Sequence, residues 1–225
     1  MTPDTPAIPA LRAIPLFATL DEPMLAALAA QARWRTFAAG ETVFLEGEPA
    51  AGLYFLQSGW LKVVKVSPSG REQVIKYLEP RETFNEIGAF SNQPNPATAV
   101  ALEDAGVWLI QREGLMRLLA ERPSFAQHLI EKMADRVQHL VELISDLSLR
   151  PVTGRLARLL LAQAVDEVVP RPRWYTQAEL AARLGAVPDV IQRALRRLAD
   201  DGVIIVERQQ IRIQDQKTLE QIAVS

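Results

Sequence analysis

Residues 174–213 read WYTQAELAARLGAVPDVIQRALRRLADDGVIIVERQQIRI, two short helical patterns followed by a hairpin pattern. Thr176, with Glu179 three residues later, forms the capping-box signature of a helix start. Gly185 can adopt the positive φ with which such a helix commonly ends. Pro188 suits the first turn of a second helix. Two short helices joined by a three-residue turn are typical of a helix-turn-helix.

The second of these helices has an apolar face and a polar face. Ile191, Leu195 and Leu198 recur at the spacing of a buried stripe, and the pattern stops near Gly202. The residues of the other face are Asp189, Gln192, Arg193, Arg196 and Arg197. Such side chains suit the base edges and phosphates of a major groove. A lone basic helix is more often merely solvated, but the turn and the following hairpin favour DNA binding.

The composition excludes several kinds of site. The 225 residues are 48% hydrophobic, enough for one or two cores, and include no cysteine. This excludes disulfides, thiolate zinc sites, iron–sulfur clusters ligated by cysteine, and redox sensing by cysteine. There is neither a secretory leader pattern nor an apolar stretch of membrane-spanning length. We therefore expect a cytoplasmic protein without membrane contact.

The charge is distributed unevenly around a net value of −2. Residues 150–225 hold 12 basic and 9 acidic residues, a net charge of +3, whereas residues 1–149 hold 13 and 18, a net charge of −5. A local basic excess can support phosphate contacts without making the whole protein basic. The excess lies in the part of the chain with the helix-turn-helix pattern.

Residues 34–110 contain short strand patterns separated by glycines, which argue for an antiparallel barrel or roll. The predicted strands are Thr42–Leu45, Leu53–Gln57, Trp60–Val66, Gln73–Leu78, Thr98–Leu102 and Val107–Gln111. The preceding residues 11–32 read as short helices, one of which begins after Asp21.

A long helix is predicted after Pro123. Its apolar residues alternate in spacing between three and four, an a/d seam that requires a partner helix. The seam residues are Ile130, Met133, Val137, Leu140, Ile144 and Leu147. The simplest partner is the same helix of a second subunit; the alternative is burial within one chain. Arg150–Pro151 ends this helix, and a further helix is predicted over 152–168.

The order of these elements resembles the cyclic-AMP receptor/fumarate–nitrate regulator (Crp/Fnr) family over nearly the whole chain. The stretches that carry the resemblance are Gly40–Glu41, Gly47–Ala50, Tyr54–Leu56, Gly59, Gly70–Gln73, Phe84–Gly88 and Thr176–Gly185, with Arg193 and the hairpin of 203–213. The resemblance implies a sensor domain that controls the grip of a dimer on palindromic double-stranded DNA. It also implies contact with RNA polymerase and favours activation over repression.

The expected fold class is α+β, with three regions. Residues 1–122 would form an antiparallel β-roll of the cyclic-nucleotide-binding kind, preceded by short helices. Residues 123–150 would form the dimerisation helix, and residues 151–225 a winged helix-turn-helix DNA-binding domain.

The effector pocket departs from the family pattern. In the cyclic-AMP binders, the phosphate cassette runs from a Gly-Glu pair to an Arg-Ser pair about ten residues on; Asn85–Glu86 and Pro96–Ala97 stand at these positions here. A buried cyclic phosphate needs a cation, and Pro96 offers neither charge nor donor. The resemblance places the pocket at Asn85, Glu86, Ala97 and Thr98. We expect weak or no cyclic-AMP binding and a structural role for Glu86.

Other signals stay open. The residues around Asn95–Ala99 are similar to nitric-oxide-responsive members, which keeps haem open as a cofactor. His128 and His139 fall at f and c positions, away from the seam, and are interpreted as surface residues. A 2-oxoglutarate or another small acid, or no ligand at all, is equally open.

The family's DNA-contacting positions are matched in part. Arg193 is kept and can donate twice to a guanine. Asp189 has a shorter arm than the family's glutamate, and Gln192 can pair with adenine or guanine. Pro188 removes the first arginine of the pattern, so one guanine contact is lost. The positions that grip phosphate are matched by Thr176 and Gln177, and Arg208 in the wing turn is a candidate backbone contact.

Enzyme motifs are missing from the sequence, which has no cysteine nucleophile, no phosphate loop, and no histidine–carboxylate spacing of a metal site. We therefore expect no catalytic residues and no metal. The alternative function is a ligand-binding regulatory module that acts without DNA, and residues 174–213 argue against it.

Overall fold

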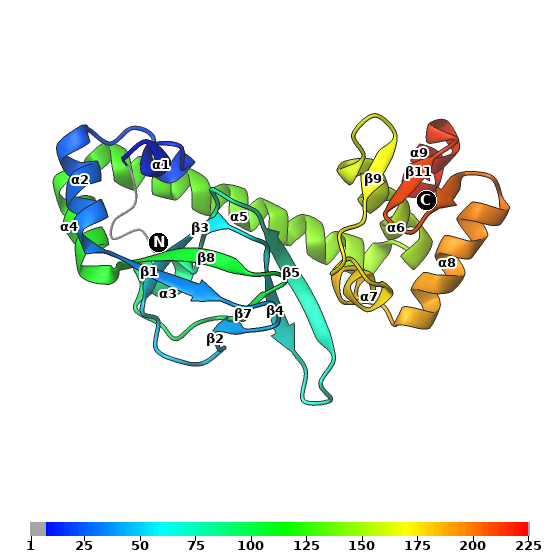
Figure 1. The fold of residues 1–225 in the computed structure, drawn as a ribbon, viewed down its shortest axis with the longest axis horizontal. Helices are drawn as coiled ribbons and strands as arrows, with labels where there is room; N and C mark the ends of the chain where they lie inside the picture. Colours follow the sequence, from blue (N-terminus) through cyan, green and yellow to red (C-terminus); the bar gives the residue numbers. More distant parts are fainter. Residues whose placement is uncertain (1–7, 225) are drawn as a thin grey trace. The chain divides into compact units, whose positions relative to one another are not determined.

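The computed structural model describes residues 8–224, which fall into two compact units. One is formed by residues 8–66 and 75–138, and the other by residues 67–74 and 139–224. Figure 1 labels most of the helices and strands of both units.

The first unit begins with short helices: α1 (Ile8–Arg12), a 3-10 turn (Pro15–Phe17) and α2 (Glu22–Gln31). Asp21 caps α2, because its side chain accepts a hydrogen bond from the backbone N–H of Met24 at 3.1 Å. Pro23 sits in the first turn, where its missing N–H costs nothing. The predicted helix start after Asp21 is confirmed.

Two four-stranded sheets follow, with the orders β1-β8-β3-β6 and β2-β7-β4-β5. Their strands are β1 (Ala32–Phe37), β2 (Thr42–Phe44), β3 (Gly52–Ser58), β4 (Leu61–Val66), β5 (Glu72–Leu78), β6 (Thr83–Phe84), β7 (Thr98–Ala101) and β8 (Ala105–Gln111). The strand β8 pairs antiparallel with β1 and β3, and β7 pairs antiparallel with β2 and β4. The expected antiparallel roll is confirmed, and each of the six predicted strands is present.

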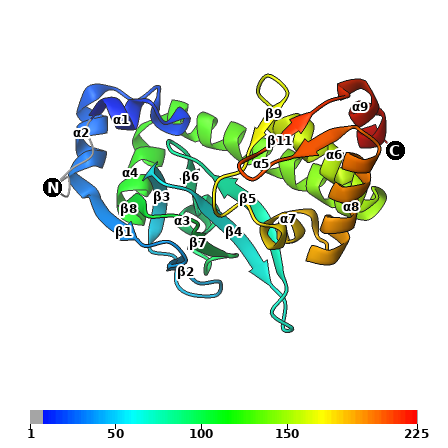
Figure 2. The same ribbon diagram turned by 45° about the vertical axis from the view of Figure 1, so that its right-hand side comes forward.

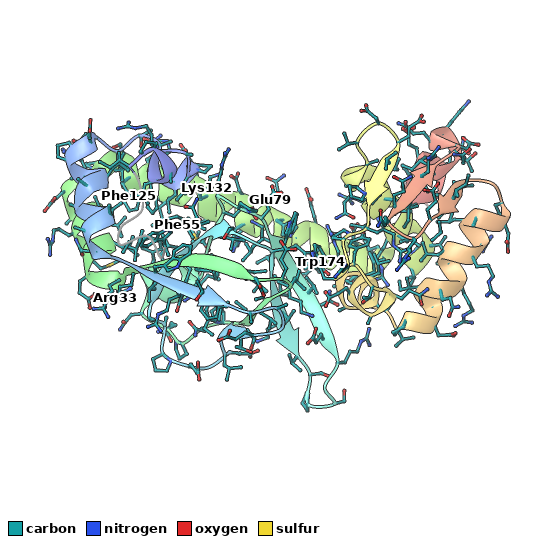
Figure 3. The ribbon with its side chains drawn as sticks, in the orientation of Figure 1. Arg33, Phe55, Glu79, Phe125, Lys132 and Trp174 are labelled. Carbon is teal, nitrogen blue, oxygen red and sulfur yellow. The ribbon has the colours of Figure 1, made fainter. Side chains whose placement is uncertain are left out.

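The strand β3 supplies both cores of this unit, because successive side chains point to opposite faces of a sheet. Tyr54 and Leu56 face the second sheet, and Tyr54 stacks on Phe84 of the neighbouring strand β6 with ring centroids 5.2 Å apart. Burial raises the pKa of Tyr54. Leu53 and Phe55 face the helices, where the core includes Phe125; Phe55 and Phe125 are labelled in Figure 3. Each of these fully buried side chains contributes about 1.5–3 kcal/mol.

Three further helices complete the first unit: α3 (Glu86–Ser91), α4 (Arg112–Glu121) and α5 (Pro123–Leu149), which continues into the second unit. The helix α5 is 27 residues long, and Phe125 and Leu129 anchor its first turns in the core. The long helix predicted after Pro123 is therefore confirmed.

The second unit contains α6 (Val152–Gln163), β9 (Val168–Pro170), α7 (Gln177–Leu184), α8 (Pro188–Asp200), β10 (Ile204–Val206), β11 (Gln210–Ile213) and α9 (Gln216–Val224). The strands form a sheet of order β10-β11-β9. Its core combines Leu160 of α6, Leu180 of α7, Leu195 of α8 and Ile211 of β11. Figure 2 shows the short turn at which α7 and α8 meet. This is a winged helix-turn-helix, as expected.

The helix expected over 152–168 ends at Gln163, so its predicted end was wrong. Val165 and Val168 exchange backbone hydrogen bonds of 2.9 and 3.0 Å across Asp166 and Glu167, which have φ values of 50° and 63°. The next residue, Val169, is fully buried and pairs with Ile211 of β11. Burial of a β-branched side chain in the sheet therefore outweighs continuation of the helix.

Candidate nucleic-acid interface and effector pocket

The boundaries of the helix-turn-helix are set by local interactions. The Thr176 hydroxyl accepts a hydrogen bond from the backbone N–H of Glu179 at 3.2 Å, as the capping signature predicts. Gly185 ends α7 with φ 60°, and its N–H donates to the carbonyl of Ala181. Val187 precedes α8, and Pro188 stands in its first turn. The turn between the helices is thus the three residues 185–187.

The two faces of α8 differ sharply in exposure. Its buried residues are Ile191, Ala194, Leu195 and Leu198. The five residues predicted to face DNA are exposed, as is Asp200 at the end of the helix; the five are Asp189, Gln192, Arg193, Arg196 and Arg197. The packed face holds the helix rigidly against the core, so the opposite face is presented as a fixed surface. A rigid support is what precise recognition by side chains requires.

The arginines of α8 are held only loosely by their neighbours. Arg193 lies 3.1 Å from Asp189 and Arg197 lies 3.8 Å from Asp201, both as i,i+4 pairs on the exposed surface. Exposed pairs of this kind contribute little free energy, so a stronger partner can replace them. Asp189 also holds the Arg193 guanidinium along the helix before DNA is bound. The face is therefore available for base and phosphate contacts.

The wing is the hairpin of β10 and β11. The backbone N–H of Glu207 donates to the carbonyl of Gln210 at 2.9 Å and closes the turn. Arg208 is exposed at this turn. The turn needs no glycine, because neither Arg208 nor Gln209 has a positive φ.

The seam of α5 is largely uncovered in the single chain. Ile130 is 69% exposed, Val137 60% and Ile144 64%. The intervening members Met133, Leu140 and Leu147 are partly buried. The helix thus carries a row of apolar side chains that neither unit covers by itself.

The four predicted pocket residues are all buried in one cassette. They are Asn85 and Glu86 at the start of α3, and Ala97 and Thr98 at the start of β7. Asn85 joins the two segments, since its side-chain N–H donates to the side-chain oxygen of Asn95 at 3.0 Å. The same amide donates to the carbonyl of Gly52 at 3.2 Å. Asn85 has φ 66°, a left-handed conformation that asparagine adopts more readily than most other residues.

Asn95 is the centre of this cassette, and sequence reasoning did not single it out as a site residue. It is 3% exposed, and its amide N–H donates to the carbonyl of Leu45 at 3.1 Å. Its backbone bonds the same loop twice, to Glu48 and Gly47, at 2.9 Å each. The side-chain oxygen of Asn85 is buried without a hydrogen-bond partner among the described residues. The amides at this place thus bind one another and the backbone.

Glu86 is also used internally. One carboxylate oxygen accepts from the Thr83 hydroxyl at 2.8 Å, and the other lies 3.2 Å from a guanidinium nitrogen of Arg136 on α5. Glu86 is almost fully buried and Arg136 only partly so. A buried carboxylate needs such a cation and donor. The pairing of Arg136 with Glu86 was not predicted from the sequence, because the two residues lie fifty positions apart. The one signal for it was the g position of Arg136, beside the seam of α5.

The remaining predicted features are unremarkable in geometry. His128 is partly buried, with Nδ1 2.9 Å from the carbonyl of Ser124, and His139 is exposed. Within residues 8–224, no three histidine or acidic side chains gather as metal ligands would. No helix in this range combines the length and apolar character needed to cross a membrane.

Both units match known protein families. Residues 34–122 match the cyclic nucleotide-binding domain, and residues 154–222 match the Crp-like helix-turn-helix domain. A candidate cAMP-binding regulatory protein from Silicibacter pomeroyi has a solved structure that is 30% identical, covers 96% of this chain and 100% of its own, and superposes with a TM-score of 0.62. The chain belongs to the Crp/Fnr family.

One further relative and one further solved structure are also similar to this chain. The CRP-like cAMP-activated global transcriptional regulator of Mycobacterium tuberculosis is 29% identical over 91% of this chain and 94% of its own length. FixK2 from Bradyrhizobium japonicum is 22% identical and has the same fold, with a TM-score of 0.76 over 86% of this chain and 98% of its own. The chain is therefore a transcription regulator of the Crp type with a DNA-binding helix-turn-helix.

Proposed function

We propose that two copies of this chain bind a palindromic DNA site, with α8 of each copy in a major groove. The observation that carries the proposal is the face of α8: three arginines, a glutamine and two aspartates, one at each end of the helix, are exposed, and the opposite face is packed in the core. Two such helices read half-sites one helical turn, about 34 Å, apart.

The proposed roles follow from side-chain chemistry. Arg193 donates twice to the O6 and N7 atoms of a guanine, and Asp189 accepts from a cytosine amine nearby. Gln192 pairs with adenine or guanine. Arg196 and Arg197, one turn further along α8, contact phosphates. The remaining backbone contacts are assigned to Thr176, Gln177 and Arg208.

The proposed dimer interface is the seam of α5. A second α5 would bury Ile130, Val137 and Ile144, which a single chain leaves more than half exposed. Val141, at the e position, is 56% exposed and would widen the contact. Seams with this spacing pair as left-handed coiled coils. Leu129 and Arg136, at g positions, instead contact the β-roll of their own chain.

We propose that the effector is not cyclic AMP. The four pocket residues Asn85, Glu86, Ala97 and Thr98 offer no cation, and Pro96 stands where the family's cyclic-AMP binders have arginine. Asn85 and Glu86 already bond to neighbouring groups of the protein. A cyclic phosphate would have to displace these bonds, and the Arg136 guanidinium at this place is already paired with Glu86.

The proposal extends to the protein's setting. The relative from Mycobacterium tuberculosis is a transcriptional regulator, which supports a role without catalysis, in the cytoplasm, with RNA polymerase as the partner that responds to the bound regulator. The division of labour would be sensing by residues 1–122, pairing by 123–150 and DNA binding by 151–225.

The test is selection of binding sites from randomised DNA, with wild type, Arg193→Ala and Arg196→Ala. Arg193→Ala should lose about 1–3 kcal/mol of discrimination at one guanine per half-site. Arg196→Ala should weaken all sequences evenly and reduce the salt dependence by about one ion per subunit. An unchanged sequence preference in Arg193→Ala, with only general affinity lost, would show that α8 is not the reading helix.

A further inference from the structure

The turn of the hairpin between β4 and β5 belongs to the second unit, although β4 itself belongs to the first. We call residues 67–74 of this hairpin the hairpin tip. It includes Gly70–Gln73, one of the stretches in which the chain resembles the family. These residues belong neither to the cassette nor to the face of α8, so the functions proposed above give them no role.

The hairpin tip is held in one shape by its own hydrogen bonds. The backbone N–H of Ser67 donates to the carbonyl of Arg71 at 2.8 Å, and the hydroxyl of Ser67 accepts from the backbone N–H of Arg71 at 3.0 Å. Gly70, with φ 79°, donates through its N–H to the carbonyl of Ser67 at 2.9 Å. The backbone that carries the Arg71 side chain is therefore fixed by a closed turn.

Two side chains of the hairpin tip bond to the helix-turn-helix. The Nη2 atom of Arg71 donates to the carbonyl of Gly185 at 2.6 Å. The Nε2 atom of Gln73 donates to the carbonyl of Arg183 at 3.3 Å, and also to its own neighbour Val74 at 3.1 Å. The last carbonyls of a helix have no partner within that helix. The hairpin tip thus supplies donors to the end of α7 and to the turn that follows it.

The turn is also packed closely, which only a glycine permits. A Cβ atom at Gly185 would lie 2.9 Å from Oε1 of Gln73 and 2.6 Å from a methyl carbon of Leu147. Gly185 is the first of the three residues 185–187, and Pro188 begins α8 directly after them. The bonds from Arg71 and Gln73 therefore act on the backbone that leads into the reading helix.

The hairpin tip supports the reading helix without covering it. With the tip in place, Asp189, Gln192 and Arg193 are exposed, as are Arg196 and Arg197. A segment that blocked DNA binding would have to bury some of these side chains. The partner atoms of the tip are backbone carbonyls, which carry no base-reading chemistry. The contact is therefore suited to holding the turn rather than to masking the DNA-binding face.

We propose that Arg71 and Gln73 are positioning residues for DNA recognition, because they fix the turn from which α8 starts. The proposal rests on the DNA-binding function proposed above. Neither residue contacts DNA in this role. Without their hydrogen bonds, the turn would occupy several conformations, and the measured affinity would fall by the fraction of molecules whose α8 is correctly placed. The DNA-binding machinery thus includes a hairpin that continues from the β-roll.

The first experiment measures the DNA affinity of the full-length dimer over a salt series. Arg71→Met, which keeps a long side chain but has no donor, should weaken binding about tenfold. The slope of log affinity against log salt should stay unchanged, because no phosphate contact is lost. Arg33→Met is the matched control, since Arg33 is an exposed arginine of β1 and is labelled in Figure 3. It should leave both quantities unchanged.

Three results of this experiment would overturn the proposal. Unchanged affinity in Arg71→Met would show that the hydrogen bond does not position α8. A slope lowered by about 0.9 per subunit would show that Arg71 itself binds a phosphate. Tighter binding would show that the hairpin tip opposes DNA binding. Thermal unfolding of Arg71→Met should match wild type, because the Arg71 side chain is exposed.

A conservative variant tests whether the donor is the cause. Arg71→Lys keeps a donor on a long side chain and should recover about half or more of the loss in log affinity. No recovery would overturn the hydrogen bond as the cause. Gln73→Met tests the second bond independently, and it should weaken binding about threefold because the bond that it removes joins two neutral groups. Wild-type affinity in Gln73→Met would remove Gln73 from the proposal.

The second experiment measures hydrogen exchange in the full-length dimer without DNA. In Arg71→Met, the amides of residues 186–191 should exchange about tenfold faster than in wild type, because the turn opens more often. The amides of residues 203–213, which form the wing, serve as the internal control and should keep their rates. Unchanged exchange at residues 186–191 would overturn the proposal, whatever the effect on DNA affinity.

Failure of this proposal is distinct from failure of DNA recognition by α8. Selection from randomised DNA gives the base preference of Arg193→Ala separately. A lost guanine preference in Arg193→Ala, together with wild-type affinity in Arg71→Met, would overturn the positioning role and leave the proposed function intact. An unchanged preference in Arg193→Ala would instead overturn the proposed function, on which the positioning role rests.

Discussion

The cassette of the first unit and the helix-turn-helix of the second each depend on a residue with positive φ, but they use it differently. Asn85, with φ 66°, precedes α3 and bonds through its side chain to Gly52 and Asn95. Gly185, with φ 60°, ends α7; a Cβ atom there would lie 2.6 Å from a methyl carbon of Leu147. At Asn85 the residue's own side chain forms the hydrogen bonds of the turn, whereas at Gly185 the turn requires a residue without a Cβ atom.

The two regions also differ in how they use their polar side chains. In the cassette, the polar side chains of Asn85, Asn95 and Glu86 bond to other groups of the protein, and the side-chain oxygen of Asn85 is left without a partner among the described residues. In the helix-turn-helix, the turn is held by backbone and apolar contacts and by a hydrogen bond of 2.6 Å from the Arg71 guanidinium to the Gly185 carbonyl, and the polar side chains of α8 remain in water. The second unit therefore leaves the polar side chains of α8 exposed, whereas the first unit uses the polar side chains of the cassette internally.

The largest effect is expected from a substitution that tests whether DNA binding by the second unit requires the dimer. Ile144→Asp places like charges across the proposed two-fold axis, which should produce monomers at micromolar concentration and weaken DNA binding by about 100-fold or more. Light scattering and gel shifts measure the two effects. Gln138→Asp, exposed on the same helix outside the seam, should remain dimeric. A dimeric Ile144→Asp protein would show that the interface lies elsewhere.

The next prediction tests the first unit, which we expect not to bind cyclic AMP. Calorimetry with cyclic AMP should detect no binding in the micromolar range, because loss of a bidentate arginine–phosphate contact costs about 100-fold or more in affinity. Added cyclic AMP should also leave DNA affinity unchanged. A micromolar dissociation constant would mean that another cation, such as Lys76 or Arg81, reaches the phosphate. For Lys76 this would require release from Glu82, which lies 2.5 Å away.

A pair of glycine substitutions sharpens the account of the second unit. Gly202, with φ 71°, has nothing within 4 Å of an added Cβ, so Gly202→Ala should lower the free energy of unfolding by about 1–2 kcal/mol through backbone strain alone. Gly185→Ala adds the clash with Leu147 and should cost about 1–3 kcal/mol more. Urea denaturation measures both. Equal losses would show that Leu147 moves aside freely.

The smallest effect concerns the cassette. Asn85→Gly keeps the positive φ but loses two hydrogen bonds and leaves Asn95 short of a partner, so it should lower the free energy of unfolding by about 1–2 kcal/mol. Asn92 is the matched control, because it also has a positive φ, 58°, and is exposed at the end of α3. Asn92→Gly should be near neutral in urea denaturation. Similar values for both would show that the amide bonds of Asn85 contribute little.

The sequence predicted most of the elements whose signals are local. The cap at Thr176, the stop at Gly185 and the start at Pro188 each act within one helical turn, so single residues were enough to place α7 and α8. The strand β1 was missed because it lies at a sheet edge and shows little alternation: Arg33, Arg35 and Thr36 are all exposed. The end of α6 was misplaced because β9 exists only by pairing with β11.

The sequence by itself determined which side chains α8 presents and which residues form the seam of α5, because helical periodicity assigns a residue to a face without reference to any other segment. Only the tertiary structure decided what the cassette and the wing do with their polar groups. Asn85 meets Asn95 ten residues away, Glu86 meets Arg136 fifty residues away, and Arg171 meets the wing turn. Hydrogen bonds between segments that are distant in the sequence depend on how the sheets and helices pack. No local sequence pattern tells which of these segments will meet.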